Sequence, residues 1–195
     1  DLPGAVGRGG SVVELAIGTG RGGLPLAQRC LRVAGIERSA AMVARLRGKP
    51  GGDETSIPVL VGDMTTEQMP GAGSFSLVFL VFNSLMNLTT QEAQLACFQN
   101  AATHLAAGGH FLVEMQVPGL RRLPAGERFV VFDQSAAHFG IDGYDVATQR
   151  LWSRHRDFPR AASGAGRSPP SPHWWPPVTA LIARVPRMPP APPRA

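Results

Sequence analysis

The feature that most constrains the fold is the glycine-rich turn Gly-Thr-Gly-Arg-Gly-Gly at residues 18–23, which follows a short β-branched segment at residues 11–17. Helical spacing of apolar residues begins at Leu24, and Pro25 is acceptable in the first turn of a helix. Glycine lets the chain turn tightly and lets a ligand approach the backbone amides at the start of the helix. The sequence therefore predicts a strand, a glycine turn and a helix that open a ligand site. A glycine-rich turn without a ligand is the alternative.

Strand-like and helix-like segments then alternate five times, which predicts an α/β fold with a Rossmann-like, doubly wound, mostly parallel sheet. In such a sheet a ligand binds at the carboxyl ends of the strands, near the switch in strand order. Residues 77–82 are apolar on both faces, as expected for a buried parallel strand. The predicted strands are 11–17, 33–36, 57–61, 77–82 and 110–117; the predicted helices are 24–33, 39–46 with Ser39 as N-cap, and one from Thr89 or Thr90 to about Leu105, closed by residues 107–109.

After the fifth strand the pattern changes to an antiparallel extension. Residues 129–132, a turn at 140–143 and residues 146–154 predict antiparallel strands. From about Arg156 onward the composition shifts, since residues 156–195 hold 11 of the 18 prolines, and proline removes a backbone donor. We therefore expect a domain at residues 1–155 and an irregular, largely disordered Pro/Arg-rich tail at 156–195.

The net charge of +5 belongs to this tail. Residues 1–155 carry 13 basic and 13 acidic side chains, whereas residues 156–195 carry six arginines against one acid. A neutral body gives no reason to expect a nucleic-acid partner. The longest apolar run has six residues, against about 20 for a membrane helix, so we expect no membrane span. Cys30 and Cys97, without metal-type spacing, are expected to be buried on helices in a cytoplasmic protein.

Three carboxylates lie within or shortly after the first three predicted strands and narrow the choice of ligand. The turn satisfies G-x-G-x-x-G, which alone is a weak dinucleotide signal. Glu14 lies inside the first strand, where a cationic ligand gains from it and a pyrophosphate does not. Glu37 can accept hydrogen bonds from vicinal ribose hydroxyls, and Asp63 from an exocyclic amine such as that of adenine. The set describes an adenosine that carries a positive group, and helix-capping surface carboxylates are the alternative for each acid taken singly.

Five ordered segments resemble the class I S-adenosyl-methionine-dependent methyltransferases, most closely the bacterial small-molecule type. The resemblance implies that Gly18 and Gly20 lie under the methionine part of S-adenosyl-L-methionine, with Glu14 near its ammonium. It also implies that Glu37 binds the ribose, that Asp63 and the Met64 amide bind adenine, and that Phe82 and Asn83 line the methyl end. The matching segments are residues 12–21 (VVELAIGTGR), 35–42 (GIERSAAM), 62–64 (GDM), 75–88 (FSLVFLVFNSLMNL) and 105–114 (LAAGGHFLVE).

The sequence departs from the family pattern at two positions and at both ends. Ala16 stands where the family has the first glycine of the turn, and Ser76 where many relatives have Asp. Only ten residues precede the first strand, where relatives have a helix that closes over the methionine carboxylate. In the tail, Trp175 and Pro176 fall at family-like intervals, but the prolines from Pro186 onward are expected to leave the sheet without its closing antiparallel pair. We expect a chain truncated or frame-altered at both ends.

Methyl transfer from a sulfonium requires alignment of the acceptor atom, methyl and sulfur, and a general base only when the acceptor is protonated. His138 and Tyr144 in the antiparallel segment are the candidate bases, whereas His104 and His110 are expected to cap or pack. No metal constellation is visible. The expected function is methyl transfer to a small molecule. A non-catalytic methyltransferase-like binding module and an NAD-dependent oxidoreductase are the alternatives.

Overall fold

The computed structural model describes residues 6, 10–29, 31–115, 123–145, 147, 150–158 and 179–184. The chain divides into two compact units, Asp1–Gln116 with Val178–Ala195, and Val117–Pro177. Cys30, which was expected on a helix, lies outside the described residues. The boundary expected near Arg156 stays a prediction, because most of residues 156–195 also lie outside them.

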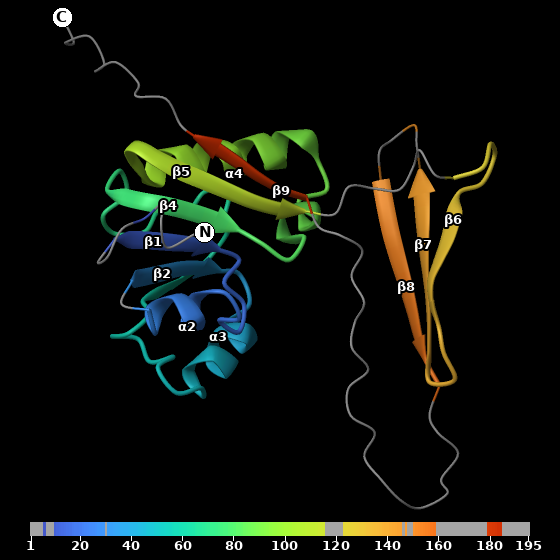
Figure 1. Ribbon diagram of the computed structural model, residues 1–195, viewed down its shortest axis with the longest axis horizontal. Helices are drawn as coiled ribbons and strands as arrows, with labels where there is room; N and C mark the ends of the chain where they lie inside the picture. The colour runs from blue at the N-terminus through green and yellow to red at the C-terminus, as the bar shows by residue number, and fades with distance from the viewer. Residues whose placement is uncertain are drawn as a thin grey trace, which may run out of the picture. The chain divides into compact units, whose positions relative to one another are not determined.

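The first unit contains a six-stranded sheet in the order β3-β2-β1-β4-β5-β9 (Figure 1). β1 (Ser11–Leu15) pairs in parallel with β2 on one side and with β4 on the other. β1 and β4 therefore form the switch point at which doubly wound sheets bind ligands. The remaining parallel strands are β2 (Arg32–Glu37), β3 (Val59–Val61), β4 (Phe75–Leu80) and β5 (Leu105–Met115), so the predicted fold class is confirmed.

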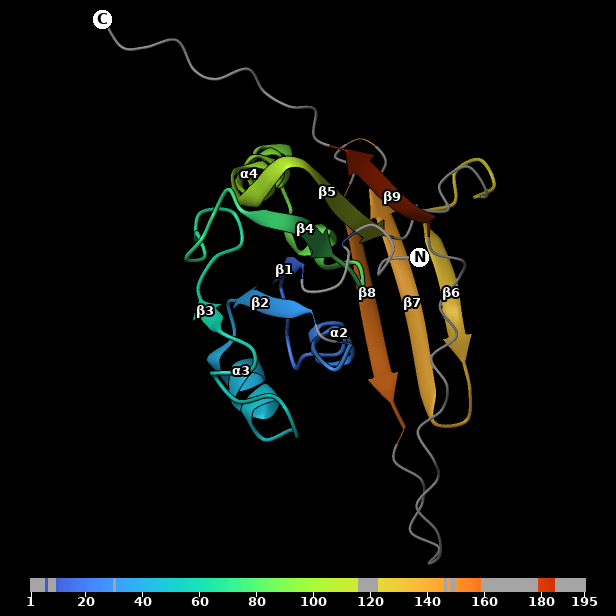
Figure 2. The same cartoon turned by 60° about the vertical axis from the view of Figure 1, so that its left-hand side comes forward.

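Helices cover both faces of this sheet, with α2 (Gly23–Ala27) and α3 (Ala40–Arg47) on one face and α4 (Gln91–His104) on the other (Figures 1 and 2). A short 3-10 helix, η1 (Ser84–Asn87), follows β4. The Ser39 hydroxyl accepts from the Met42 amide, and the Thr90 hydroxyl accepts from the Ala93 amide. Both side chains satisfy an amide that has no partner inside its helix, so the two predicted N-caps are confirmed.

Several predicted boundaries are wrong, and two of them are wrong by five residues or more. The helix expected at residues 24–33 ends at Ala27, because the chain must extend again for Val33 to pair with Val12 in β1. The fifth strand begins at Leu105 instead of His110. Residues 107–109, expected to close the preceding helix, form an irregular part of β5, where the register with β4 shifts. Tertiary pairing overrides the local helix and turn signals at both places.

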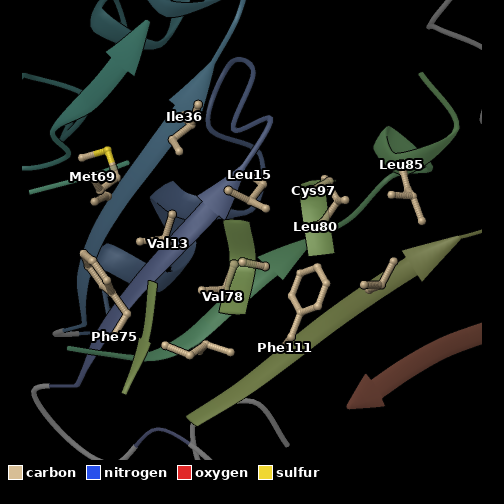
Figure 3. Packing of buried hydrophobic residues seen from close by; sticks show 14 residues of the cluster. Val13, Leu15, Ile36, Met69, Phe75, Val78, Leu80, Leu85, Cys97 and Phe111 are labelled. Carbon is tan, nitrogen blue, oxygen red and sulfur yellow. The ribbon is translucent and has the colours of Figure 1, made fainter. Parts of the chain in front are cut away.

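The buried side chains form one apolar cluster on each face of the sheet. Alternate residues of a strand point to opposite faces, so Val78 and Leu80 join the cluster beneath α4, and Leu77 and Phe79 join the cluster beneath α2 and α3. The α4-side cluster, which includes the fully buried Cys97, is shown in Figure 3. Burial on both faces explains the continuous apolar run of β4 and fixes where the ends of the strands lie.

A sixth strand, β9 (Thr179–Arg184), pairs antiparallel with β5 along residues His110–Met115. We expected the sheet to lack its closing antiparallel pair of strands. This expectation is wrong for one strand of the pair, because β9 is present. The prolines begin at Pro186, after the strand has ended, so they do not remove any amide from this pairing.

The second unit is a three-stranded antiparallel sheet in the order β6-β7-β8, made of β6 (Phe129–Gln134), β7 (His138–Asp145) and β8 (Arg150–Asp157). The antiparallel extension is thus confirmed, but the turn predicted at residues 140–143 is wrong. Gly140 and Gly143 lie inside β7, beneath the rings of Phe132 and Trp152. A Cβ at either glycine would lie within 2.3 Å of ring carbons, so these glycines make room for aromatic rings and do not turn the chain.

Candidate functional site

The side chains singled out in the first unit gather at one edge of the sheet. Because β1 to β5 are parallel, their carboxyl ends meet at the same edge. Glu14 is the penultimate residue of β1, and Glu37 is the last residue of β2. Asp63 follows β3 by two residues, and Phe82 follows β4 by two. The topology therefore places the predicted site residues of the sheet around the switch point.

Glu14 is a buried carboxylate without a full set of partners. The residue is 1% exposed, and its Oε2 has no hydrogen-bond partner among the described residues. The carboxylate lies beside the glycine turn, since a Cβ built at Gly22 would be 2.5 Å from Oε1. The pKa of Glu14 is raised to about 8, mainly by burial; a hydrogen bond from the Gly23 backbone opposes this rise, and the charge of Glu37 adds a smaller increase. A buried acid of this kind is stabilised in its charged form by a cation.

The turn between β1 and α2 depends on left-handed backbone conformations. Gly18 has a φ of +57° and Gly20 a φ of +77°, which glycine adopts without strain. A Cβ at Gly20 would also lie 2.4 Å from Leu46 Cδ1, so the turn packs directly against α3. Ala16 has a φ of +55°. This explains why the family has glycine at that position, and the alanine costs about 1 kcal/mol in strain.

Glu37 joins the glycine turn to the start of α3. Its Oε2 accepts a hydrogen bond from the Gly18 amide, and its Oε1 accepts one from the Ser39 amide, both at 2.8 Å. A carboxylate has about four acceptor positions, so two remain after these bonds. Glu37 therefore holds the turn in place and still has the capacity to accept from a pair of hydroxyls.

Asp63 and Met64 are fixed by neighbouring side chains. Asp63 Oδ1 accepts from the Thr65 hydroxyl at 2.7 Å and from the Thr65 amide at 2.8 Å. These bonds keep the pKa of Asp63 below its usual value, with a smaller contribution from Arg38. Asn100 on α4 donates to the Met64 carbonyl at 3.0 Å. The segment thus presents an ionised carboxylate whose Oδ2 takes neither Thr65 bond.

The loop after β4 contains a contact that sequence reasoning missed. Phe82 and Asn83 have φ values of +58° and +60°, which are rare for residues other than glycine. The guanidinium of Arg21, in the glycine turn, lies 4.6 Å from the centroid of the Phe82 ring. Glu114, near the end of β5, accepts a hydrogen bond from the Phe82 amide at 3.3 Å. Arg21 and Glu114 both lie in the motif segments, but nothing in the sequence indicates that each of them contacts Phe82.

The predicted bases lie in the second unit. His138 Nδ1 is 2.8 Å from Asp133 Oδ2, and His138 Nε2 is 3.1 Å from His155 Nδ1. Tyr144 is 6% exposed and donates to Asp142 at 3.5 Å; burial, and then the Asp142 charge, raise its pKa. His138 thus has a carboxylate that orients it, whereas Tyr144 holds its proton more firmly than a free tyrosine.

His104 is the other histidine that the structure explains. It is fully buried on α4, where Nε2 accepts from the Met69 amide at 2.9 Å and Nδ1 lies 2.8 Å from the Asn100 carbonyl. The prediction that His104 packs in the core is confirmed. Among the described residues no group of three or more His, Cys, Asp or Glu is arranged to hold a metal ion.

Residues 12–109, just over half of the chain, match the family described as methyltransferase domain. The chain belongs to this family. The matched segment contains the glycine turn together with Glu14, Glu37 and Asp63, so the predicted resemblance to class I S-adenosyl-methionine-dependent methyltransferases is confirmed. A search of curated proteins gives no significant match. None of the described helices combines the length and apolar character needed to cross a membrane.

Solved methyltransferase structures share the fold. The CcbJ methyltransferase from Streptomyces caelestis is 29% identical with a TM-score of 0.65; the match covers 78% of this chain and 62% of that one. CalS10 from Micromonospora echinaspora, an amino pentose methyltransferase with S-adenosyl-methionine bound, is 23% identical with a TM-score of 0.56, covering 82% and 73%. The glycopeptide N-methyltransferase MtfA, complexed with sinefungin, is 19% identical with a TM-score of 0.56, covering 80% and 66%. This chain therefore spans less than two thirds of the length of CcbJ.

Proposed function

We propose that this methyltransferase domain binds S-adenosyl-L-methionine at the carboxyl edge of its sheet and transfers the methyl group to a small-molecule acceptor. The observation that carries the proposal is the Glu14 carboxylate, which is 1% exposed and has an unpartnered Oε2 beside the glycine turn. A buried, unpaired carboxylate is costly unless a cation reaches it. The ammonium of the methionine part is such a cation, so this feature of the site fits the cofactor of the family.

The other residues supply complementary groups for the nucleoside. Glu37 has two acceptor positions left for the vicinal ribose hydroxyls after it has bound the two backbone amides. Asp63, whose pKa is lowered, can accept from the exocyclic amine of adenine, and the Met64 amide is the proposed donor to the adenine ring. Ala16, Gly18 and Gly20 form the turn under the methionine part, and Phe82 with Asn83 lines the methyl end.

When bound, the cofactor supplies a methyl group on a positively charged sulfur, which is already a good leaving group. The chain therefore has to position the acceptor in line with the methyl and exclude water. A proton must also leave the acceptor when it is protonated at the working pH. We propose His138 over Tyr144 for this step, because Asp133 orients the His138 ring, whereas burial and Asp142 oppose ionisation of Tyr144.

Small-molecule acceptors are supported by the character of the structural neighbours. Two proteins that share the fold are named as an amino pentose methyltransferase (CalS10) and a glycopeptide N-methyltransferase (MtfA). The neutral body of the chain, with 13 basic and 13 acidic groups in residues 1–155, gives no electrostatic support for a nucleic-acid acceptor. A cytoplasmic location remains part of the proposal.

Thermal unfolding with S-adenosyl-L-homocysteine, and separately with NAD, tests the proposal. A ligand at one hundred times its Kd stabilises the folded state by about 2.7 kcal/mol, which shifts the midpoint by several degrees. We expect a shift with S-adenosyl-L-homocysteine and none with NAD. A shift with NAD alone would favour an oxidoreductase, and the absence of both shifts in a cooperatively folded protein would favour a non-catalytic module.

A further inference from the structure

Arg21, in the glycine turn, lies over an aromatic ring from the loop after β4. Its Cζ lies 4.6 Å from the centroid of the Phe82 ring, and the Arg21 side chain is exposed. The ion pairs found among the described residues do not include Arg21. The guanidinium therefore stands beside the proposed cofactor site with its charge not neutralised by a carboxylate.

The Phe82 ring is fixed in place by the backbone. Phe82 and Asn83 both adopt left-handed φ values, and the Phe82 amide donates to Glu114 Oε2 at the end of β5. A left-handed conformation costs about 1 kcal/mol or more at a non-glycine residue, and such strain is typical of functional sites. The ends of β4 and β5 thus impose a conformation that presents this ring, half exposed, to Arg21.

A guanidinium stacked on a ring remains able to bind an anion. Its N–H groups lie in its own plane, so the stacking face and the hydrogen-bonding edge are used independently. The geometry of a carboxylate matches two of these N–H groups in a bidentate pair. Phe82 can therefore hold the Arg21 plane while the edge of the guanidinium binds a carboxylate.

The opposite charges of Glu14 and Arg21 complement an α-amino acid. Glu14 precedes the turn and has the buried, unpartnered Oε2, and Arg21 directly follows Gly20. A negative group before the turn and a positive group within it match an ammonium and a carboxylate on the same ligand. The methionine end of the proposed cofactor carries both groups on one carbon.

We propose that Arg21 binds the α-carboxylate of the methionine part of the cofactor and that Phe82 is the positioning residue that holds its guanidinium. This inference rests on the proposed function. It assigns a carboxylate-binding residue within the glycine turn itself.

Calorimetric titration with three ligands tests the inference. S-adenosyl-L-homocysteine carries both the ammonium and the carboxylate, its decarboxylated analogue keeps only the ammonium, and 5′-methylthioadenosine has neither. We expect the wild-type protein to bind S-adenosyl-L-homocysteine about tenfold or more tightly than the decarboxylated analogue, as for a charged hydrogen-bonded pair. Arg21→Met should abolish this preference and leave the affinities for the other two ligands within about twofold.

Matched variants separate recognition from structure. Arg29→Met removes an exposed arginine that follows α2 and should retain the preference. Arg21→Lys keeps the charge but loses the planar fork, so it should retain only part of the preference. Phe82→Leu should reduce the preference by about threefold because the stacking is lost. Phe82→Tyr keeps an aromatic ring and should retain the wild-type preference.

Two results would overturn the inference while leaving the proposed function intact. One is binding of S-adenosyl-L-homocysteine by Arg21→Met with an unchanged preference. The other is an equal loss of affinity for all three ligands, which would mean that Arg21 only supports the turn. Failure of the wild-type protein to bind any of the three would instead overturn the proposed function, and this inference with it.

Discussion

Replacement of Glu14 by glutamine should change how stability depends on pH. Burial raises the pKa of this carboxyl from its ordinary value of 4.5 to about 8 in the folded protein. Between these two values the folded state holds a proton that the unfolded state has released. The stabilisation of the folded state by this protonated carboxyl is fully present below pH 4.5, and it is lost as the pH rises toward 8. Glu14→Gln removes the titrating group with little change of shape.

The size of the effect follows from the two pKa values. Each pKa unit is worth about 1.4 kcal/mol, so raising the pH from 5 to 8 should lower the free energy of unfolding by about 3 to 4 kcal/mol through Glu14 alone. Other groups titrate over the same range in both proteins. The difference between wild type and Glu14→Gln therefore isolates this contribution.

Urea unfolding of both proteins at pH 5, 6, 7 and 8 measures this difference. We expect the wild-type protein to lose stability relative to Glu14→Gln as the pH rises. Glu92→Gln, which removes an exposed carboxylate from the first turn of α4, serves as the control and should run parallel to the wild type. Parallel curves for wild type and Glu14→Gln would refute the argument that burial keeps Glu14 protonated.

Four further predictions concern the ligand and the core. S-adenosyl-L-homocysteine should release up to about one proton from Glu14 on binding at pH 7, since its ammonium favours the carboxylate; calorimetry in buffers of different ionisation enthalpy measures this. Glu37→Ala leaves two backbone amides without an acceptor and should lower the free energy of unfolding by about 2 to 4 kcal/mol in denaturant titrations. Asp63→Ala should weaken S-adenosyl-L-homocysteine binding about tenfold by calorimetry, and an unchanged affinity would exclude the adenine contact. His104→Ala should destabilise the fold by about 2 to 4 kcal/mol because it breaks buried hydrogen bonds, yet leave ligand affinity within twofold.

The features that the sequence predicted well are those with a local cause. Ser39 and Thr90 cap their helices because a hydroxyl at the right spacing reaches an amide three residues later. Glu37 ends β2 and Asp63 follows β3, and parallel pairing then brings the carboxyl ends of these strands to one edge. Local spacing together with a single topological rule was enough to predict that these carboxylates lie at one edge of the sheet.

The features that the sequence did not predict depend on contacts between distant segments. Gly140 and Gly143 have the composition of a turn, but they lie in a strand because aromatic rings from neighbouring strands cover them. β9 is a strand because the edge of β5 offers it partners. The stacking of Arg21 on Phe82 joins residues from two loops, and no spacing rule connects them. The role of His138 as catalytic base stays a proposal, because no spacing rule connects it with the methyl-transfer site.

A crystal structure with S-adenosyl-L-homocysteine bound tests the central claim most directly. We expect electron density for the ligand at the carboxyl edge of β1 and β4, with its ammonium toward Glu14 and its ribose hydroxyls within hydrogen-bond distance of Glu37. Density elsewhere on the chain, or a ligand at this edge whose ammonium points away from Glu14, would contradict it.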